Sequence, residues 1–332
     1  RGGADRGDPG HLWRGPVKCS TCQAKAAIEI RRHNAAFCGP CFLTHLERQV
    51  QRTIESEKML HPGERVLVAV SGGKDSLCLW EILRRQGYET TGLHLDLGIG
   101  GYSPEGRKKT EAYAEAHGLP LQVTEVKEET GFAIPELAER TRRPPCSGCG
   151  LSKRYLMNRA ALEGGFPVLA TGHNLDDVAA ILFGNVLHWQ VEQLSRMTPV
   201  RPATHPRLVK TVKPLIRVTE REAVAYCLLR GLDYHEDECP NAVGATSLLY
   251  KDIINQIEAV SPGSKQAFYQ EFVKKLQPHL AAQETVSLRE CDVCGQATTG
   301  EVCAYCRMME RARQVTVRRG RVTRTVLEVP PA

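Results

Sequence analysis

The sequence predicts an α/β protein in which a parallel, doubly wound sheet carries helices on both faces and is flanked by two small zinc ribbons. Short apolar runs alternate with helical segments through the middle of the chain, and a set of four cysteines lies near each end. Strands that alternate with helices in this way form parallel sheets covered on both sides.

The chain has 332 residues, of which 42% are hydrophobic and 25% charged, as in a globular protein with one main domain and small appendages. No apolar run reaches the ~18 residues that a membrane span needs. We expect a disordered leader over residues 1–18, a ribbon over 19–45, the main domain over 46–280, and a second ribbon with a basic tail over 285–325.

Ten of the thirteen cysteines form Cys-x-x-Cys pairs, a spacing that directs two thiols at one metal ion and that disulfide frameworks rarely repeat. Each end of the chain holds a complete tetrahedral set, which predicts two structural zinc ions, or iron-sulfur clusters on the same ligands. The two sets are Cys19, Cys22, Cys38 and Cys41, and Cys291, Cys294, Cys303 and Cys306. Cysteines that bind metal must remain reduced, so the sequence predicts a protein of the reducing cytoplasm.

Secondary structure follows from periodicity and from helix-ending signals. A helix is expected from Phe42 to Met59, then a strand from Val66 to Val70, a glycine-containing loop, and a helix from about Asp75 to Arg85. A capping box, Thr219 with Glu222, begins a later helix. The other expected elements are strands at Thr91–Leu97, Leu119–Val126 and Val168–Thr171, and helices at Pro104–His117 and Leu151–Glu163.

The loop Ser71-Gly72-Gly73-Lys74-Asp75-Ser76 lacks Walker A spacing but has the chemistry of a phosphate site. Paired glycines let backbone amides approach an anion, and the following helix directs its positive end there. Ser71, Lys74 and Ser76 add hydroxyl and ammonium donors. Taken alone, the segment also fits an ordinary strand-to-helix turn.

Three further cysteines are candidates for a second kind of metal site. Cys146 and Cys149 form a pair without a partner pair, and Cys239 lies in an evident loop, whereas Cys78 and Cys227 fall in apolar helical runs and are expected in the core. Three thiols from two loops could hold a [4Fe-4S] cluster with one iron unligated by protein. A redox thiol pair and an incomplete zinc site are the alternatives.

Polar residues around these cysteines allow two interpretations. The segment Gly172 to Asp177 is good helix N-cap chemistry, but its two adjacent carboxylates could hold magnesium or orient a target base. Lys153 and Arg154 follow the cysteine pair and are either a solvated face or contacts to a nucleotide or nucleic acid.

The C-terminal segment is strongly basic within a chain of net charge +6. Seven arginines and a single glutamate lie between Arg307 and Arg324. Clustered arginines bind phosphate backbones, although a solvated basic end fits equally well.

Val68 to Ser76 resembles the pyrophosphate-binding loop of the PP-loop ATP pyrophosphatase superfamily, whose members adenylate their substrate and release pyrophosphate. The resemblance makes 46–280 a PP-loop catalytic domain and implies that Lys74 neutralises the departing pyrophosphate. The residues that it implies at ATP are Ala69, Ser71, Gly72, Gly73, Asp75, Ser76 and Leu95.

The zinc ribbons, the SGGKDS loop, PPCSGCGLSKR, ATGHNLDD and HEDECPNA occur in the order found in the TtuA family of tRNA 2-thiouridine synthetases, which the chain resembles from Cys19 to the final ribbon. By this resemblance Cys146, Cys149 and Cys239 ligate the [4Fe-4S] cluster. Lys153 and Asp177 sit at the active site, and Gly172 and Lys153 lie near the nucleotide. Relatives sometimes place His where Cys41 stands.

The resemblance implies that uridine O2 is adenylated by Mg²⁺-ATP and that sulfur carried by the cluster then displaces AMP. The members that the chain resembles most favour tRNA position 54. A ubiquitin-like thiocarboxylated carrier would supply sulfur, and the chain would form a homodimer. Competing interpretations are tRNA 2-thiocytidine synthesis, which the terminal ribbons oppose, thiolation of the wobble uridine, and a zinc-ribbon RNA-binding protein without catalysis.

Overall fold

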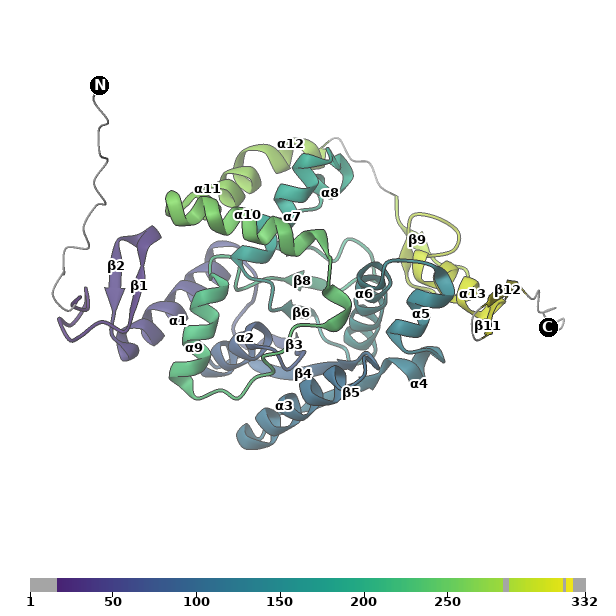
Figure 1. The fold of residues 1–332 in the computed structure, drawn as a ribbon, viewed down its shortest axis with the longest axis horizontal. Coiled ribbons are helices and arrows are strands. Elements are labelled where there is room, and N and C mark those ends of the chain that lie inside the picture. The colour runs from purple at the N-terminus through teal and green to yellow at the C-terminus, as the bar shows by residue number, and fades with distance from the viewer. Residues whose placement is uncertain (1–16, 283–286, 319–320, 325–332) are drawn as a thin grey trace, which may run out of the picture.

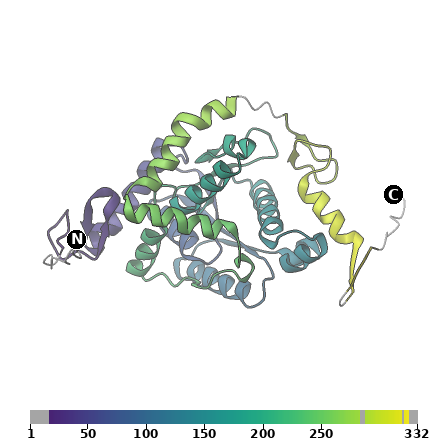
Figure 2. The ribbon, with the colours of Figure 1, turned by 45° about the horizontal axis from the view of Figure 1, so that its top comes forward.

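The structure is a computed structural model that describes residues 17–282, 287–318 and 321–324. The expected leader, residues 1–18, lies outside the described part apart from its last two residues. Figures 1 and 2 show the two cysteine-rich units at opposite ends of the molecule, with the α/β domain between them.

Six strands form the central sheet in the order β5–β4–β3–β6–β8–β7. All neighbouring strands run parallel except β7 and β8, so the predicted parallel sheet is confirmed, with one short antiparallel strand at its edge. The strands are β3 (Arg65–Ala69), β4 (Glu89–Asp96), β5 (Leu121–Glu125), β6 (Val168–Thr171), β7 (Val200–Arg201) and β8 (Lys210–Val212).

Helices bury both faces of the sheet. Val66 and Val68 point to one face and Leu67 to the other, and all three are fully buried, which explains the uninterrupted apolar run of β3. The first face is covered by α1 (Gly39–Ser56), α2 (Lys74–Arg85), α3 (Tyr102–His117), α7 (Leu175–Leu187) and α9 (Glu220–Arg230), and the second by α6 (Pro145–Glu163).

The remaining helices cover the ends of this core. Short α4 (Val126–Thr130) and α5 (Ile134–Thr141) precede α6. A helical layer packs on α7 at the top of Figure 1. It consists of α8 (Val191–Ser195), α10 (Thr246–Val260), α11 (Ser264–Glu271), the π-helical segment η3 (Phe272–Leu276) and α12 (Gln277–Ala282).

Each cysteine-rich unit contains a small antiparallel hairpin. The first pairs β1 (Ile28–Ile30) with β2 (Ala35–Phe37) around the 3-10 turn η1 (Arg31–His33). The second pairs β9 (Arg289–Glu290) with β10 (Ala297–Thr298) and continues into α13 (Ala304–Gln314). The basic segment after it forms a further hairpin, β11 (Val315–Arg318) with β12 (Arg321–Arg324).

The start of α6 corrects one expectation. Cys146 and Cys149 lie in the first turns of the helix and not in a loop, because α6 begins at Pro145 rather than near Leu151. Proline suits a first helical position, since its fixed φ is helical and its missing N–H needs no partner there. The two thiols, three residues apart, therefore share one helix face.

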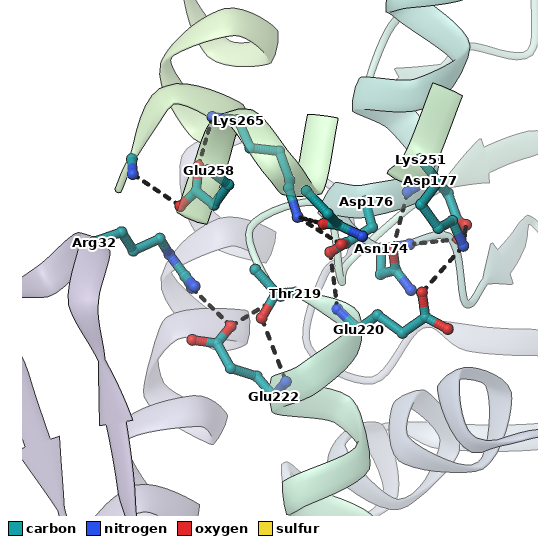
Figure 3. A network of polar contacts seen from close by, with 12 residues as sticks. Arg32, Asn174, Asp176, Asp177, Thr219, Glu220, Glu222, Lys251, Glu258 and Lys265 are labelled. Atoms are coloured by element: carbon teal, nitrogen blue, oxygen red, sulfur yellow. Dashed lines mark hydrogen bonds and ion pairs between the residues drawn. The ribbon is translucent and has the colours of Figure 1, made fainter. Parts of the chain in front are cut away.

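A buried polar network joins the first hairpin to the helices (Figure 3). Arg32 pairs with Glu222 at 2.7 Å, and Glu222 completes the predicted capping box with Thr219, which is confirmed. Lys265, only 4% exposed, pairs with the equally buried Asp176 at 2.6 Å. These residues line a cavity of about 490 Å³ that lies away from the phosphate loop.

Replacing Lys265 by Met tests this network. The variant leaves Asp176 buried without its cation, so we expect the free energy of unfolding to fall by about 3–5 kcal/mol in urea denaturation. Lys275→Met is the matched control, because Lys275 is exposed and pairs only with Glu271 on the same helical stretch. Its urea midpoint should not change, and equal losses in the two variants would contradict the account.

Candidate active site at the carboxyl edge of the sheet

The phosphate loop connects β3 to α2 and is held by its own serines. Ser76 Oγ accepts a hydrogen bond from Ser71 N at 3.1 Å and donates one to the Gly73 carbonyl at 2.9 Å. Ser71 Oγ accepts from Gly73 N at 3.4 Å. No side chain caps α2 at Gly73, so the amides of its first turn are available to an anion.

Three glycines let other backbones reach this loop. Gly72 has φ of +85°, and a Cβ there would lie 2.2 Å from the Gly106 carbonyl oxygen. A Cβ on Gly106 would lie 2.7 Å from the Ser71 carbonyl oxygen, and one on Gly172 would meet the backbone of Asp75 and Ser76 at 3.0 Å. Gly106 has no role among the residues expected from the sequence, although a glycine inside an expected helix is itself a sign of close packing.

A later segment pairs directly with the loop and brings Cys239 to it. His235 N donates to the Gly72 carbonyl at 2.8 Å, and His235 forms a parallel bridge with Gly73. The ring of Tyr102 packs on that of His235 with centroids 4.6 Å apart. His235 and Tyr102 received no role from the sequence, since only the fold places them beside the loop.

Cys146, Cys149 and Cys239 meet where α6 faces the 3-10 turn η2 (Pro240–Ala242). Cys146 Sγ donates to the Asn241 carbonyl at 3.4 Å. Cys149 and Cys239 pack against the same apolar cluster. Burial raises the pKa of Cys149, and Lys153 lowers it. The charges of Cys239 and Cys146 also raise it, so the net shift is upward.

Two observations test whether this triad fits a [4Fe-4S] cluster. Within the described residues, the three sulfur atoms of the triad do not all lie within 4.8 Å of one another. They are therefore spaced more widely than the ligands of one ion. The side-chain nitrogen of Asn241 is buried without a partner there and could donate to a cluster sulfur. The residues therefore fit a polynuclear cluster.

The two terminal sets fit single tetrahedral ions. In each set the four sulfur atoms lie within 4.8 Å of one another. The separations of Cys22 from Cys38, 3.5 Å, and of Cys294 from Cys303, 3.8 Å, approach the about 3.8 Å that Zn–S bonds impose on tetrahedral ligands. Four thiolates would leave no position for substrate on such an ion, which is typical of a structural metal site.

Alternating charges connect the phosphate loop to Asp177, and Figure 3 shows the part of this chain from Glu220 through Lys251 to Asp177. Lys74 pairs with Glu220 at 2.6 Å and with Asp75 at 3.3 Å. Lys251 bridges Glu220 at 3.1 Å and Asp177 at 2.9 Å. Burial lowers the pKa of Lys74, but Asp75 and Glu220 raise it by more than burial lowers it. The net shift is upward, so Lys74 stays charged.

Asp177 also has the structural role that the sequence offered as an alternative. It completes a capping box with Asn174 at the start of α7, and Asn174 donates to Asp75 at 2.9 Å. The expected pair of magnesium-binding carboxylates does not form, because Asp176 is buried and satisfied by Lys265 and by the Glu220 amide. Only Asp177 remains open to a ligand, with 27% of its side chain exposed.

The other expected residues lie at the same edge of the sheet. Ala69 ends β3, and Leu95 lies near the end of the adjacent strand β4. Lys153, one helical turn after Cys149, is exposed.

Cys78 and Cys227 are fully buried in the core, as predicted.

A phosphate loop at the carboxyl edge of a parallel sheet, with helices on both faces, defines a PP-loop nucleotide-binding protein. Residues 42–244 match the family described as the PP-loop domain, and residues 18–43 match the N-terminal LIM domain of 2-thiouridine synthetase TtuA. The chain belongs to the TtuA family of tRNA sulfurtransferases.

Similar proteins agree with this assignment. The tRNA-5-methyluridine(54) 2-sulfurtransferase of Thermus thermophilus is 52% identical over 88% of this chain and 91% of its own length, and that of Pyrococcus horikoshii is 42% identical over 90% and 96%. The U34-tRNA thiolase NcsA of Methanococcus maripaludis, solved with its [4Fe-4S] cluster, has a TM-score of 0.77 at 27% identity, covering 88% of this chain and 95% of NcsA.

Among the described residues, no helix is both long and apolar enough to cross a bilayer.

Gly106→Ala tests the backbone packing around the phosphate loop. The added methyl group would press on the Ser71 carbonyl, and overpacking of about 1–3 kcal/mol weakens ATP binding roughly tenfold if it falls on the loop. Gly101→Ala, near the start of the same helix, meets open space and should bind ATP like the wild type. Isothermal titration calorimetry measures both, and equal dissociation constants would contradict the prediction.

Proposed function

We propose that this protein is an ATP-dependent tRNA-uridine 2-sulfurtransferase that adenylates uridine O2 and replaces this oxygen by sulfur. The observation that carries the proposal is the pairing of His235 with Gly72 and Gly73, which places Cys239 beside the phosphate loop. One edge of the sheet then carries a nucleotide loop and a three-thiol site, the two parts that activation and sulfur insertion require.

The loop residues bind the triphosphate of ATP so that uridine O2 can attack the α-phosphorus. Amides and hydroxyls of Ser71, Gly73 and Ser76 hold the pyrophosphate, and Mg²⁺ accompanies it. Lys74 exchanges its contact with Glu220 for the leaving pyrophosphate and neutralises the charge that develops there.

Asp177 and Lys153 act on the uracil and the nucleotide. When O2 bonds to phosphorus, the proton on N3 must leave, and Asp177 is a carboxylate positioned to accept it. Lys251 holds this carboxylate in place through an ion pair at 2.9 Å. Lys153 contacts the α-phosphate, and the proton returns to N3 when AMP departs.

Cys146, Cys149 and Cys239 would hold a [4Fe-4S] cluster, which when bound would supply the sulfur-transfer chemistry. Tyr102 and Cys149 pack against one buried apolar cluster on this side of the site. The two terminal cysteine sets each hold structural zinc and stay outside the chemistry.

Similarity supports the finer assignments. Three relatives at 39–52% identity are named for uridine 54, which favours position 54 over the wobble uridine named for NcsA. Relatives called cytoplasmic tRNA 2-thiolation protein 1 support a cytoplasmic protein. A ubiquitin-like thiocarboxylated carrier as sulfur donor and a homodimer rest on the family resemblance.

The nucleoside product tests the proposed reaction. After anaerobic reconstitution with iron and sulfide, unmodified tRNA and ATP should give a 2-thiouridine at position 54 by mass spectrometry, with AMP and pyrophosphate formed. Cys149→Ser should abolish the product, whereas Cys78→Ala, a change in the core, should retain it. A 2-thiocytidine, a thiolated wobble base, or ATP turnover to ADP would each contradict the corresponding part of the proposal.

Asp177→Asn separates catalysis from helix capping. Asparagine can still accept the capping hydrogen bond but cannot take a proton at neutral pH, so thiolation should fall by about 10²-fold or more. The thermal midpoint and ATP affinity should stay close to wild type. A parallel loss of midpoint and activity would make Asp177 a structural residue.

A further inference from the structure

A second group of cations lies beyond the carboxyl edge of the sheet, on the side of α6. Leu169 of β6 packs with residues of α6 and is the register partner of Thr211 on β8. Side chains alternate along strands, so Lys213, two residues after Thr211, projects to the same side. Arg201 on β7 pairs with Thr211 and shares that face.

The N-terminal half of α6 adds Arg154 to this group. The charges act on one another, because burial and then Arg154 lower the pKa of Arg201. Burial and then Arg201 lower the pKa of Lys213 to about 8. Burial and then Lys213 lower the pKa of His173, just after β6, to about 4. Arg154, Arg201 and Lys213 therefore form one positive field, named here the β8 cation cluster.

Carboxylates do not neutralise the β8 cation cluster. In the described part of the chain, none of its three members makes an ion pair, and Lys213 Nζ donates only to the Thr198 carbonyl at 3.4 Å. The cations around the phosphate loop contrast with this, since Lys74 and Lys251 each pair with carboxylates. Like charges held together without counter-charges are unfavourable unless an anionic ligand joins them.

The position of the cluster identifies which anion it takes. In the sheet order β8 lies two strands from β3, about 10 Å away, and β7 lies about 14 Å away. Figure 1 shows β8, β6, β3, β4 and β5 in this order. In the proposed function ATP extends from the loop after β3 toward Leu95 on β4, on the other side of β3. The cluster therefore faces the second substrate and not the nucleotide.

We propose that Arg154, Arg201 and Lys213 bind backbone phosphates of the RNA next to the target nucleotide, so that the substrate approaches the site from the β8 side. The identity of the RNA as tRNA rests on the proposed function. Each contact positions the strand without reading its sequence, because phosphates carry no base information.

The salt dependence of tRNA binding tests this proposal. The full-length protein is titrated with an unmodified tRNA transcript at several salt concentrations, and Arg201→Gln and Lys213→Met are compared with wild type. Each variant should weaken binding roughly tenfold at low salt and reduce the slope of log K against log salt by about 1. The ATP dissociation constant should be unchanged, and Arg201→Lys should restore the slope.

Arg48→Gln is the matched control, an exposed arginine on α1 without an ion pair among the described residues. Its slope should equal that of wild type. Unchanged slopes in Arg201→Gln and Lys213→Met, or a weaker ATP affinity with an unchanged tRNA slope, would overturn the proposal. If the two variants lower the slope but the wild-type protein makes no thiolated nucleoside, this inference stands and the proposed function is rejected.

Discussion

Backbone contacts around Gly72 are the constraint on which the site depends. The Gly72 carbonyl accepts a hydrogen bond from the His235 amide, and the absence of a Cβ on Gly72 leaves room for Gly106 of α3. Gly172 lets the end of β6 reach the start of α2 in the same way. Three chain segments thus meet the phosphate loop without side chains between them, and each carries functional residues to one edge: Cys239, Tyr102 and Asp177.

Charge organises this edge into two regions of different behaviour. Around the loop, Lys74, Glu220, Lys251 and Asp177 alternate in sign and fix one another, so the nucleotide side is electrostatically balanced before ligands bind. Beyond β6 no member of the β8 cation cluster forms an ion pair with a carboxylate in the described residues, and the charge of Cys149 acts on Arg154 alone. The balanced region suits precise chemistry, and the unbalanced region suits the capture of a polyanion.

The local features of the sequence predicted the sheet, the capping box and both cysteine sets, because each depends on neighbours within a few residues. The start of α6 was misplaced, since Pro145 was interpreted as part of a loop and not as a first helical residue. The roles of His235, Lys251 and Arg201 could not be predicted, because each depends on contacts with segments about 10 to 160 residues away along the chain, which only the fold determines.

Crystallography with anomalous scattering at the iron edge tests the central claim, that one edge of the sheet joins an ATP loop to a three-thiol cluster site. The protein would be reconstituted anaerobically and crystallised with a non-hydrolysable ATP analogue. The account predicts iron density bounded by Cys146, Cys149 and Cys239, one iron without a protein ligand, and the triphosphate on the amides of the Ser71–Ser76 loop. A single zinc ion on the three thiols, or a triphosphate bound away from the loop, would contradict it.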